Sequence, residues 1–374
     1  MINPKEFYEG LRNKEVDFFT GIPDSSLKHL CAYITDNTDK KNHIIAANEG
    51  NAIALAAGKY LATKKIPLVY MQNSGQGNTI NPLASLVDPD VYSIPLLMLI
   101  GWRGEPGKKD EPQHVKQGKI TLKLLETLDI PYEVLPENMK EAKGTIERAF
   151  RYMESNNAPY AIVIKKGSFE EYSLQNKIES NYEMSREDAI KILTENLEDG
   201  DIVISTTGKT SRELFEYREE LNQGHEKDFL TVGSMGHSSS IALGIALSKP
   251  ERTVYCFDGD GALIMHLGAS AIIGQNAPEN FKHIVLNNGV HDSVGGQPTV
   301  GFQINIQEIA KACGYKETFE ATTKEELKEK IKQLKNSNGP TILEIKIKKG
   351  ARKELGRPTR TPQENKKDFM EFLD

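Results

Sequence analysis

The sequence predicts an α/β protein of two domains, each with a mostly parallel sheet and helices on both faces. Along most of the 374 residues, short apolar runs that end in Gly, Asp or Asn alternate with helical patterns. This alternation is typical of buried parallel strands joined by crossover helices. The periodicity fails between Gly167 and Glu183, where polar residues dominate. A chain of this length also commonly divides into two domains.

The first domain is expected over residues 1–167 and opens with an amphipathic helix over residues 3–14. Strands are expected at residues 16–20, 43–47, 67–71, 94–100, 132–135 and 160–165, with helices at 27–34 and 53–62. Ser25 or Ser26 is a candidate N-cap for the second helix. Polar, glycine-rich loops follow the strands at 21–26, 72–78 and 101–107. Ligands of parallel sheets bind beyond the carboxyl ends of the strands, so these loops are candidate binding loops.

A linker is expected over residues 168–184 and a second domain over residues 185–374. The capping box Ser185-x-x-Asp188 opens its first helix. Strands are expected at 202–205, 229–232, 254–257, 284–286 and 340–347. Thr322-x-x-Glu325 is expected to cap a charged helix over 325–334, and a Pro-rich tail ends in a helix over 365–373. No sequence repeat relates the two domains, although two similar halves are implied.

Composition excludes several classes of function. The net charge of −6, without a basic block, argues against nucleic acid as a partner. No apolar run approaches the length of a membrane span, and the first residues lack the apolar core of a signal peptide. Cys31, Cys256 and Cys313 are few, odd in number and without metal-ligand spacing. We therefore expect reduced thiols that fill the core of a cytoplasmic enzyme.

Two apolar runs end in chemically distinctive loops. One ends in Asp258-Gly259-Asp260-Gly261 and, after twenty-five residues, the next ends in Asn287-Asn288-Gly289. Neighbouring parallel strands would place Asp260 and Asn288 side by side at one edge of the sheet. A carboxylate and an amide oxygen suit Mg²⁺, which a phosphate group would help to coordinate. A structural turn with a chance pair of asparagines is the alternative.

This pair of loops resembles the cofactor-binding motif of the thiamine-diphosphate enzymes. In that family the Asp, the second Asn and the carbonyl two residues further on bind the magnesium ion that holds the diphosphate. The resemblance implies Asp260, Asn288 and the carbonyl of Val290 as metal ligands. It also implies that the backbone of Gly259 and Gly261 lies beside the diphosphate, because glycine permits a close approach.

The same resemblance assigns a role to Glu49, at a strand end in Ala46-Ala-Asn-Glu-Gly50. The family uses a glutamate that hydrogen-bonds N1′ of the aminopyrimidine ring and thereby activates the cofactor. A carboxyl group in a dry pocket can share this proton because desolvation raises its pKa. Alternatively, Glu49 only complements the dipole of the helix that it begins.

The loop Gly233-Ser-Met-Gly236 resembles the family loop that supports the bent cofactor. Met235 corresponds to the bulky apolar residue under the two rings, and Ser234 is expected beside it. A flexible thioether fills an irregular gap well. The alternative is that Met235 is an ordinary core residue.

The order of the two domains, without a middle domain, resembles the phosphonopyruvate decarboxylases, with sulfopyruvate decarboxylases close behind. The similarity covers essentially the whole chain and includes Gly21-Ile-Pro-Asp-Ser25, Asp110-Glu-Pro-Gln-His114, Asn288-Gly-Val-His-Asp-Ser-Val-Gly-Gly-Gln-Pro298 and Gly356-Arg-Pro-Thr359. It implies decarboxylation of 3-phosphonopyruvate to phosphonoacetaldehyde and CO₂ on the way to 2-aminoethylphosphonate. Sulfopyruvate or another 2-oxo acid is the alternative substrate.

The resemblance also implies which side chains surround the substrate. Expected catalytic groups, besides Glu49, are Asp24, Ser25, His114 and His291. A histidine can transfer protons near neutral pH. Expected substrate contacts are Ser25, Arg103, His114, Ser293 and Arg357. The two arginines are candidates for binding the phosphonate because a guanidinium group matches its oxygens.

In the resembling family the glutamate and the diphosphate motif meet across two chains, which implies a homodimer or a dimer of dimers. Two other classes of protein are alternatives. A binding or regulatory protein without catalysis would not need Glu49. A nucleotide-dependent α/β enzyme would need a phosphate loop, and Gly208-Lys209-Thr210 lacks the upstream glycine spacing of one.

Overall fold

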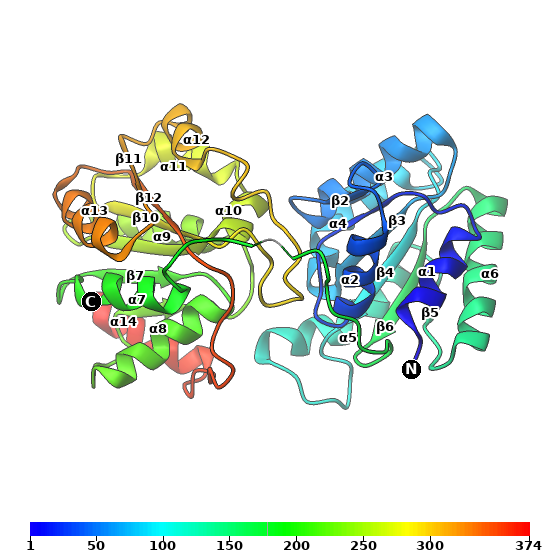
Figure 1. The fold of residues 1–374 in the computed structure, drawn as a ribbon, viewed down its shortest axis with the longest axis horizontal. Helices are drawn as coiled ribbons and strands as arrows, with labels where there is room; N and C mark the ends of the chain where they lie inside the picture. The colour runs from blue at the N-terminus through cyan, green and yellow to red at the C-terminus, as the bar shows by residue number, and fades with distance from the viewer. Residues whose placement is uncertain (178) are drawn as a thin grey trace. The chain divides into compact units, whose positions relative to one another are not determined.

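The computed structural model describes residues 1–177 and 179–374 and divides into two compact units. Unit 1 contains Met1–Lys177 and Ser293–Pro298, and unit 2 contains Ile178–Asp292 and Thr299–Asp374. Each unit contains one six-stranded sheet with helices around it (Figure 1). The predicted fold class is confirmed. Residue 178, inside the expected linker 168–184, lies outside the described residues.

The sheet of unit 1 has the order β2-β1-β3-β4-β6-β5, with all neighbours parallel. Its strands are β1 (Phe19–Gly21), β2 (His43–Ile45), β3 (Leu68–Gln72), β4 (Leu97–Trp102), β5 (Tyr132–Val134) and β6 (Tyr160–Lys165). Its α-helices are α1 (Pro4–Arg12), α2 (Lys28–Asn37), α3 (Glu49–Thr63), α4 (Gln76–Pro82), α5 (Pro112–Thr127) and α6 (Met139–Asn156).

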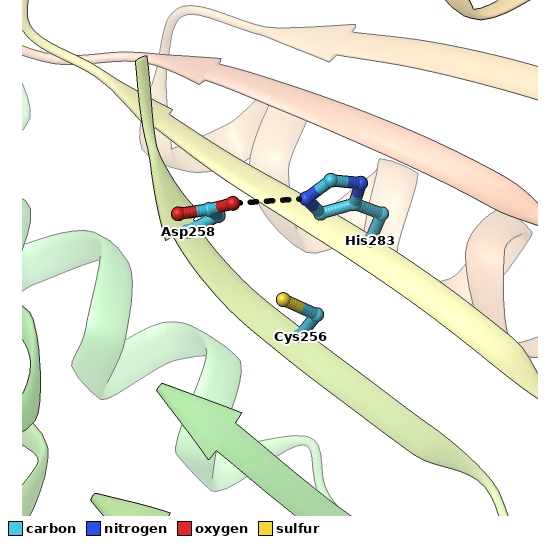
Figure 2. A group of neighbouring side chains, drawn as sticks. All are labelled: Cys256, Asp258 and His283. Atoms are coloured by element: carbon cyan, nitrogen blue, oxygen red, sulfur yellow. Dashed lines mark hydrogen bonds and ion pairs between the residues drawn. The ribbon is translucent and has the colours of Figure 1, made fainter. Parts of the chain in front are cut away.

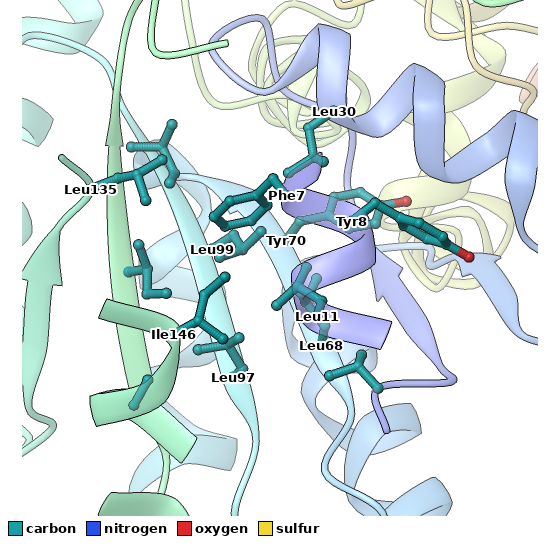
Figure 3. Packing of buried hydrophobic residues seen from close by; sticks show 14 of the residues in the cluster. Phe7, Tyr8, Leu11, Leu30, Leu68, Tyr70, Leu97, Leu99, Leu135 and Ile146 are labelled. Carbon is teal, nitrogen blue, oxygen red and sulfur yellow. The ribbon is translucent and has the colours of Figure 1, made fainter. Parts of the chain in front are cut away.

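Alternate residues of the central strands form the main core of unit 1. Leu68 and Tyr70 of β3, and Leu97 and Leu99 of β4, project to the face covered by α1, α2 and α6 (Figure 3). Leu68 pairs with Leu97 in the parallel register, so these side chains form rows across the sheet. The residues between them are also buried, because α3 packs on β1 and β3. Burial on both faces explains the continuous apolar runs.

The sheet of unit 2 has the order β11-β12-β10-β9-β7-β8 and is also parallel throughout. Its strands are β7 (Ile202–Ser205), β8 (Asp228–Leu230), β9 (Val254–Gly259), β10 (Phe281–Asn287), β11 (Glu317–Ala321) and β12 (Thr341–Lys346). Its helices are α7 (Arg186–Glu195), α8 (Lys209–Glu220), α9 (Ser238–Ser248), α10 (Asp260–Met265), α11 (Ala269–Asn276), α12 (Ile306–Cys313), α13 (Lys324–Asn336) and α14 (Pro362–Leu373).

Helix caps were predicted with mixed success. The capping box of Ser185 and Asp188 is present at α7, as predicted. At α13 the prediction is wrong by one residue, because Thr323 rather than Thr322 adopts the extended N-cap conformation and accepts the N–H of Glu326.

The start of α2 also differs from the prediction. Neither Ser25 nor Ser26 caps this helix, which begins at Lys28 after Leu27 without a side-chain cap. The Ser26 N–H instead donates to Asp24.

The segment expected to be a linker contains residues that pack into the two cores. Phe169 forms a bridge with Ile2 and lies in the core of unit 1, whereas Met184 lies in the core of unit 2. Within the described residues, no helix combines the length and the apolar character needed to cross a bilayer.

Candidate active-site residues

Glu49 lies at the first position of α3, separated by three residues from the end of β2, and is 5% exposed. Its Oε2 accepts a hydrogen bond of 2.7 Å from Asn78 Nδ2. A Cβ on Gly75 would come within 2.1 Å of its Oε1, so only glycine allows this close contact. Burial raises the pKa of Glu49, against the opposing effect of Asn78. The structure thus gives Glu49 the raised proton affinity that a carboxyl group needs to share a proton with a ligand.

Asp24 follows β1 and is completely buried. Gln72 Nε2 donates to its Oδ1 at 2.5 Å, and the Ser26 N–H donates to its Oδ2 at 2.9 Å. Burial raises the pKa of Asp24, whereas these hydrogen bonds lower it. A Cβ on Gly101 would lie 2.0 Å from its Oδ2, so Gly101 at the end of β4 makes room for the carboxyl group.

Arg103, directly after β4, links its own loop to the loop after β1. Its Nε and Nη2 donate to the two carboxylate oxygens of Asp110 at 2.8 and 2.5 Å, and its Nη1 donates to Ser25 Oγ at 2.8 Å. His114 Nδ1 lies 3.0 Å from Asp110 Oδ1. Together with the neighbouring Asp24, this group contains four of the predicted catalytic or substrate residues: Asp24, Ser25, Arg103 and His114. Glu49, also predicted in unit 1, bonds to Asn78 instead.

Asp110 holds this group together electrostatically. Although burial raises the pKa of Asp110, the hydrogen bonds from Arg103 and His114 outweigh that effect and keep its pKa well below the usual range. Burial lowers the pKa of His114, and Asp110 opposes this. At neutral pH the group therefore combines a charged guanidinium–carboxylate pair with an imidazole whose pKa lies below its ordinary value.

In unit 2, Asp260 begins α10 directly after β9 and is 2% exposed. Gly259 of β9 pairs with Leu286 of β10, so Asp260, directly after β9, is the neighbour in register of Asn287, the last residue of β10. Burial raises the pKa of Asp260 to about 6, although backbone N–H groups, including that of Asn288, lower it. A buried carboxylate with a raised pKa gains from a nearby cation.

In the turn after β10, amide and carbonyl oxygens accept hydrogen bonds from backbone N–H groups. Asn287 Oδ1 accepts the Gly289 N–H at 3.1 Å, and Asn288 Oδ1 accepts the Val290 N–H at 3.1 Å. The Val290 carbonyl accepts the Asp292 N–H at 3.0 Å. Each of these oxygens keeps a second lone pair for a further ligand.

The segment 299–301 closes over this turn. Thr299 Oγ1 donates a short hydrogen bond to Asp260 Oδ2. A Cβ on Gly301 would lie 2.6 Å from both Asp260 Oδ2 and Asn287 Oδ1, so the absence of a side chain permits this approach. The oxygen-rich donor set and the glycine cradle fit a hard cation with a phosphate group.

Met235 and His291 lie against Gly261. A Cβ on Gly261 would lie 3.4 Å from Met235 Cε and 3.3 Å from His291 Cε1. Burial lowers the pKa of His291 to about 4, so this imidazole is neutral at pH 7. Ser234 is exposed in a left-handed conformation, with φ of 55°.

Ion pairs anchor the loop that carries His291. Asp292 Oδ2 lies 3.0 Å from Lys209 Nζ and 3.5 Å from Arg186 Nη1. Ser293 and Arg357 are exposed, and their assignment to the substrate stays a prediction.

Comparisons with known proteins identify the family. Residues 5–124 match the thiamine pyrophosphate enzyme N-terminal TPP binding domain, and residues 206–345 match the C-terminal TPP binding domain of the same enzymes. Together the matches cover more than half of the chain. The chain therefore belongs to the thiamine pyrophosphate (thiamine diphosphate) enzymes.

Relatives that match the full length of the chain indicate which thiamine diphosphate enzymes it resembles most. The phosphonopyruvate decarboxylases of Streptomyces viridochromogenes and Streptomyces hygroscopicus are 33% and 32% identical to the chain, covering 100% of it and 95% and 94% of their own lengths. The sulfopyruvate decarboxylase of Methanosarcina acetivorans is 30% identical, over 100% of the chain and 98% of that relative. The predicted resemblance to these carboxy-lyases is confirmed.

Sequence reasoning gave no role to four residues that hold the candidate groups: Gln72, Asn78, Asp110 and Thr299. Asp110 carried the clearest signal, since it lies four residues before His114 in a stretch already singled out. The other three contacts join distant segments and leave no periodic pattern.

Proposed function

We propose that the chain catalyses the decarboxylation of 3-phosphonopyruvate to phosphonoacetaldehyde and CO₂, with thiamine diphosphate and Mg²⁺. The observation that carries this proposal is the group formed by Ser25, Arg103, Asp110 and His114 at the strand ends of unit 1. It offers a fixed guanidinium group, a hydroxyl group and an imidazole to a substrate with phosphonate and carboxylate oxygens. The relatives named phosphonopyruvate decarboxylase support this assignment.

The residues of unit 2 fit the metal and the diphosphate. Asp260, Asn288 and the Val290 carbonyl would bind Mg²⁺, and the backbone of Gly259 and Gly261 would approach the phosphate oxygens. When bound, thiamine diphosphate supplies the electron sink for the electrons that are released with CO₂.

Protein groups bind, orient and move protons. Glu49 would share its proton with the aminopyrimidine N1′, because burial raises its pKa. Met235 would support the cofactor rings, with Ser234 and His291 nearby. His114 would transfer protons to or from the substrate, and Asp110 orients its ring through Nδ1. Asp24, completely buried and bonded to Gln72, is a second proton-holding group beside Ser25.

We further propose a pathway, an oligomeric state and a cellular compartment for this reaction. The product would enter 2-aminoethylphosphonate synthesis, and the chain would act as a homodimer or dimer of dimers whose sites are shared between chains. The three cysteines form no disulfide, which suits a reducing cytoplasm. Sulfopyruvate is the second candidate substrate because the relative from Methanosarcina acetivorans is named for it.

Substrate competition tests the proposal. Purified enzyme should turn over phosphonopyruvate fastest, sulfopyruvate more slowly and pyruvate barely, because pyruvate leaves the phosphonate donors unpaired, which can cost a factor on the order of 10⁴. Arg103→Ala should reduce kcat/KM for phosphonopyruvate far more than for pyruvate, and Arg357→Ala is the matched comparison. Wild-type preference for pyruvate would refute the substrate assignment. Equal losses for both substrates would make that arginine structural.

A further inference from the structure

Three potential metal ligands meet inside unit 2, on the buried parts of β9 and β10 that precede Asp260 and Asn288. Cys256 and Asp258 are two residues apart on β9 and therefore project to the same face, and His283 lies opposite Cys256 on β10. One ligand atom from each residue lies within 4.8 Å of the other two. Figure 2 shows the thiol, the carboxylate and the imidazole facing a common point.

The surroundings of this cluster are apolar. Asp258 and His283 have fully buried side chains, and Cys256 belongs to a core cluster with Ile204, Val285 and Ile342. Burying an ionisable group in such a core is costly unless a partner of opposite charge compensates it. The cluster therefore requires a compensating interaction.

The contacts within the cluster compensate the buried ionisable groups only weakly. His283 Nε2 lies 3.4 Å from Asp258 Oδ2, longer than a normal hydrogen bond of roughly 2.7–3.2 Å. The other carboxylate oxygen, Oδ1, accepts the Gly259 N–H at 2.9 Å. The groups thus face one another without a short direct bond.

The orientation of His283 is fixed from its other side. Its Nδ1 lies 3.0 Å from the Tyr315 hydroxyl, which leaves Nε2 directed at Asp258 and Cys256. Metal-binding histidines commonly have such a partner on the second ring nitrogen. The buried Ser238 hydroxyl lies beside the thiol and lowers the pKa of Cys256, against the larger raising effect of burial.

We propose that Cys256 Sγ, Asp258 Oδ2 and His283 Nε2 bind one divalent transition-metal ion of the zinc type. Around a tetrahedral ion, ligand atoms about 2.0–2.3 Å from the metal lie roughly 3.3–3.8 Å from one another. The three ligand atoms, which lie within 4.8 Å of one another, would therefore need only a small approach to bind one ion. A thiolate and a carboxylate balance two positive charges, so the loaded site has no net charge in the apolar core. The Ser238 hydroxyl or a water molecule would provide the fourth ligand.

This site would be structural and distinct from the magnesium site. It ties β9 to β10, the two strands whose ends carry Asp260 and Asn288. A soft thiolate selects zinc-like ions over Mg²⁺, whereas Asp260 and Asn288 offer only hard oxygen ligands. Loading during folding suits its complete burial, and metal binding then deprotonates the thiol.

Cobalt provides the test, because Co²⁺ bound to a thiolate gives a charge-transfer band in the near ultraviolet. The full-length wild-type chain is refolded with Co²⁺ in the presence of Mg²⁺ and thiamine diphosphate, and free metal is removed. We expect about one Co²⁺ per chain, the charge-transfer band, and a higher Tm than for the chain refolded without Co²⁺. No band in the wild-type protein overturns the proposal without any need for a variant.

Variants then assign the ligands. Cys256→Ser and His283→Asn should each lose the bound Co²⁺, and Cys256→Ser should lose the band, whereas the matched Cys313→Ser should keep both. Asp260→Asn should also keep the band, since the side chain at position 260 is not one of the three proposed ligands. A band that survives in Cys256→Ser, or that is lost in Cys313→Ser, overturns the assignment.

Discussion

The two units have the same strand order although no sequence repeat relates them. Unit 1 has the order β2-β1-β3-β4-β6-β5, and unit 2 has the order β11-β12-β10-β9-β7-β8. If the strands of each unit are renumbered from one to six along the chain, both sheets read 2-1-3-4-6-5, the second from its opposite edge. The two sheets are therefore equivalent scaffolds, and their chemistry differs in the loops at the strand ends.

Those loops carry different kinds of groups. In unit 1 the ends of four adjacent strands provide Asp24, Glu49, Gln72 and Arg103, which suit proton transfer and binding of an anion. In unit 2 the ends of β9 and β10 provide oxygen ligands and glycines, which suit a metal ion and a phosphate. We therefore expect substitutions in unit 2 to act on cofactor binding and those in unit 1 to act on turnover.

The largest effect is expected for Asp260→Ala. Removing this ligand should abolish activity and weaken thiamine diphosphate binding by more than the roughly 10–100-fold that loss of an outer partner costs. Isothermal titration calorimetry with Mg²⁺ measures the binding, and circular dichroism checks the fold. Asp199→Ala is the matched control, since Asp199 is fully exposed on the same unit and contacts Lys227. Wild-type affinity in Asp260→Ala would refute the metal assignment.

Glu49→Gln should affect turnover instead. We expect kcat to fall by on the order of 10²–10⁴-fold, the range for loss of an acid–base group, with cofactor affinity little changed. Glu141→Gln is the control for the helix-dipole alternative, because Glu141 is also a first-turn acid, in α6. If both variants keep nearly full activity, Glu49 only complements its helix.

Mixing the two inactive chains tests whether the two units contribute to one site from different chains. If each site takes Glu49 from one chain and Asp260 from the other, mixed dimers of Glu49→Gln and Asp260→Ala contain one site with neither substitution. Part of the activity should then return. No recovery from dimers that mass spectrometry shows to be mixed would refute shared sites.

The sequence predicted the candidate groups better than the contacts that hold them. Asp260 and Asn288 could be placed together because both follow apolar runs, and the parallel pairing of β9 with β10 confirms that their strand ends are neighbours. Thr299, whose hydrogen bond to Asp260 spans 39 residues, left no comparable pattern. Side-chain contacts between loops depend on the folded path of the chain and not on local periodicity.

The dependence on the folded path also explains why the sequence did not predict β11 or the cluster of Cys256, Asp258 and His283. β11 lies at the edge of its sheet and is mostly exposed or half-buried, so it lacks the apolar run that identified the central strands. Cys256, Asp258 and His283 are brought together only by the register of β9 with β10. Without that register, the sequence predicted only that Cys256 is a core thiol.

Asp110→Asn should give an intermediate effect in unit 1. The variant removes the partner that raises the pKa of His114, so this pKa should fall further, and NMR titration of His114 measures it. Activity should fall by less than the roughly 10²–10⁴-fold expected for loss of an acid–base group itself. An unchanged His114 titration would contradict the positioning role of Asp110.

Stability provides a second measurement for the same variant. Because contacts depress the folded pKa of Asp110, its stabilisation is present above the unfolded pKa and is lost as pH falls through the folded value. Urea unfolding should therefore show Asp110→Asn less stable than wild type at neutral pH. The difference should shrink on acidification, and a pH-independent difference would point to packing instead.

The smallest effects are expected at two asparagine helix caps, one in each unit. Asn138 accepts the Glu141 N–H at 3.0 Å at the start of α6 in unit 1, and Asn305 accepts the Glu308 N–H at 3.0 Å at the start of α12 in unit 2. Replacing either by Ala should cost about 1 kcal/mol of unfolding free energy, because one backbone donor loses its acceptor. Asp at either position keeps an acceptor oxygen and should retain most of that stability in urea unfolding. Equal losses in the Ala and Asp variants would show that packing, not capping, determines the cost. Since each cap side chain bonds to the first turn of its own helix and not to a candidate site residue, kcat should stay unchanged in all four variants, in contrast to Glu49→Gln and Asp260→Ala.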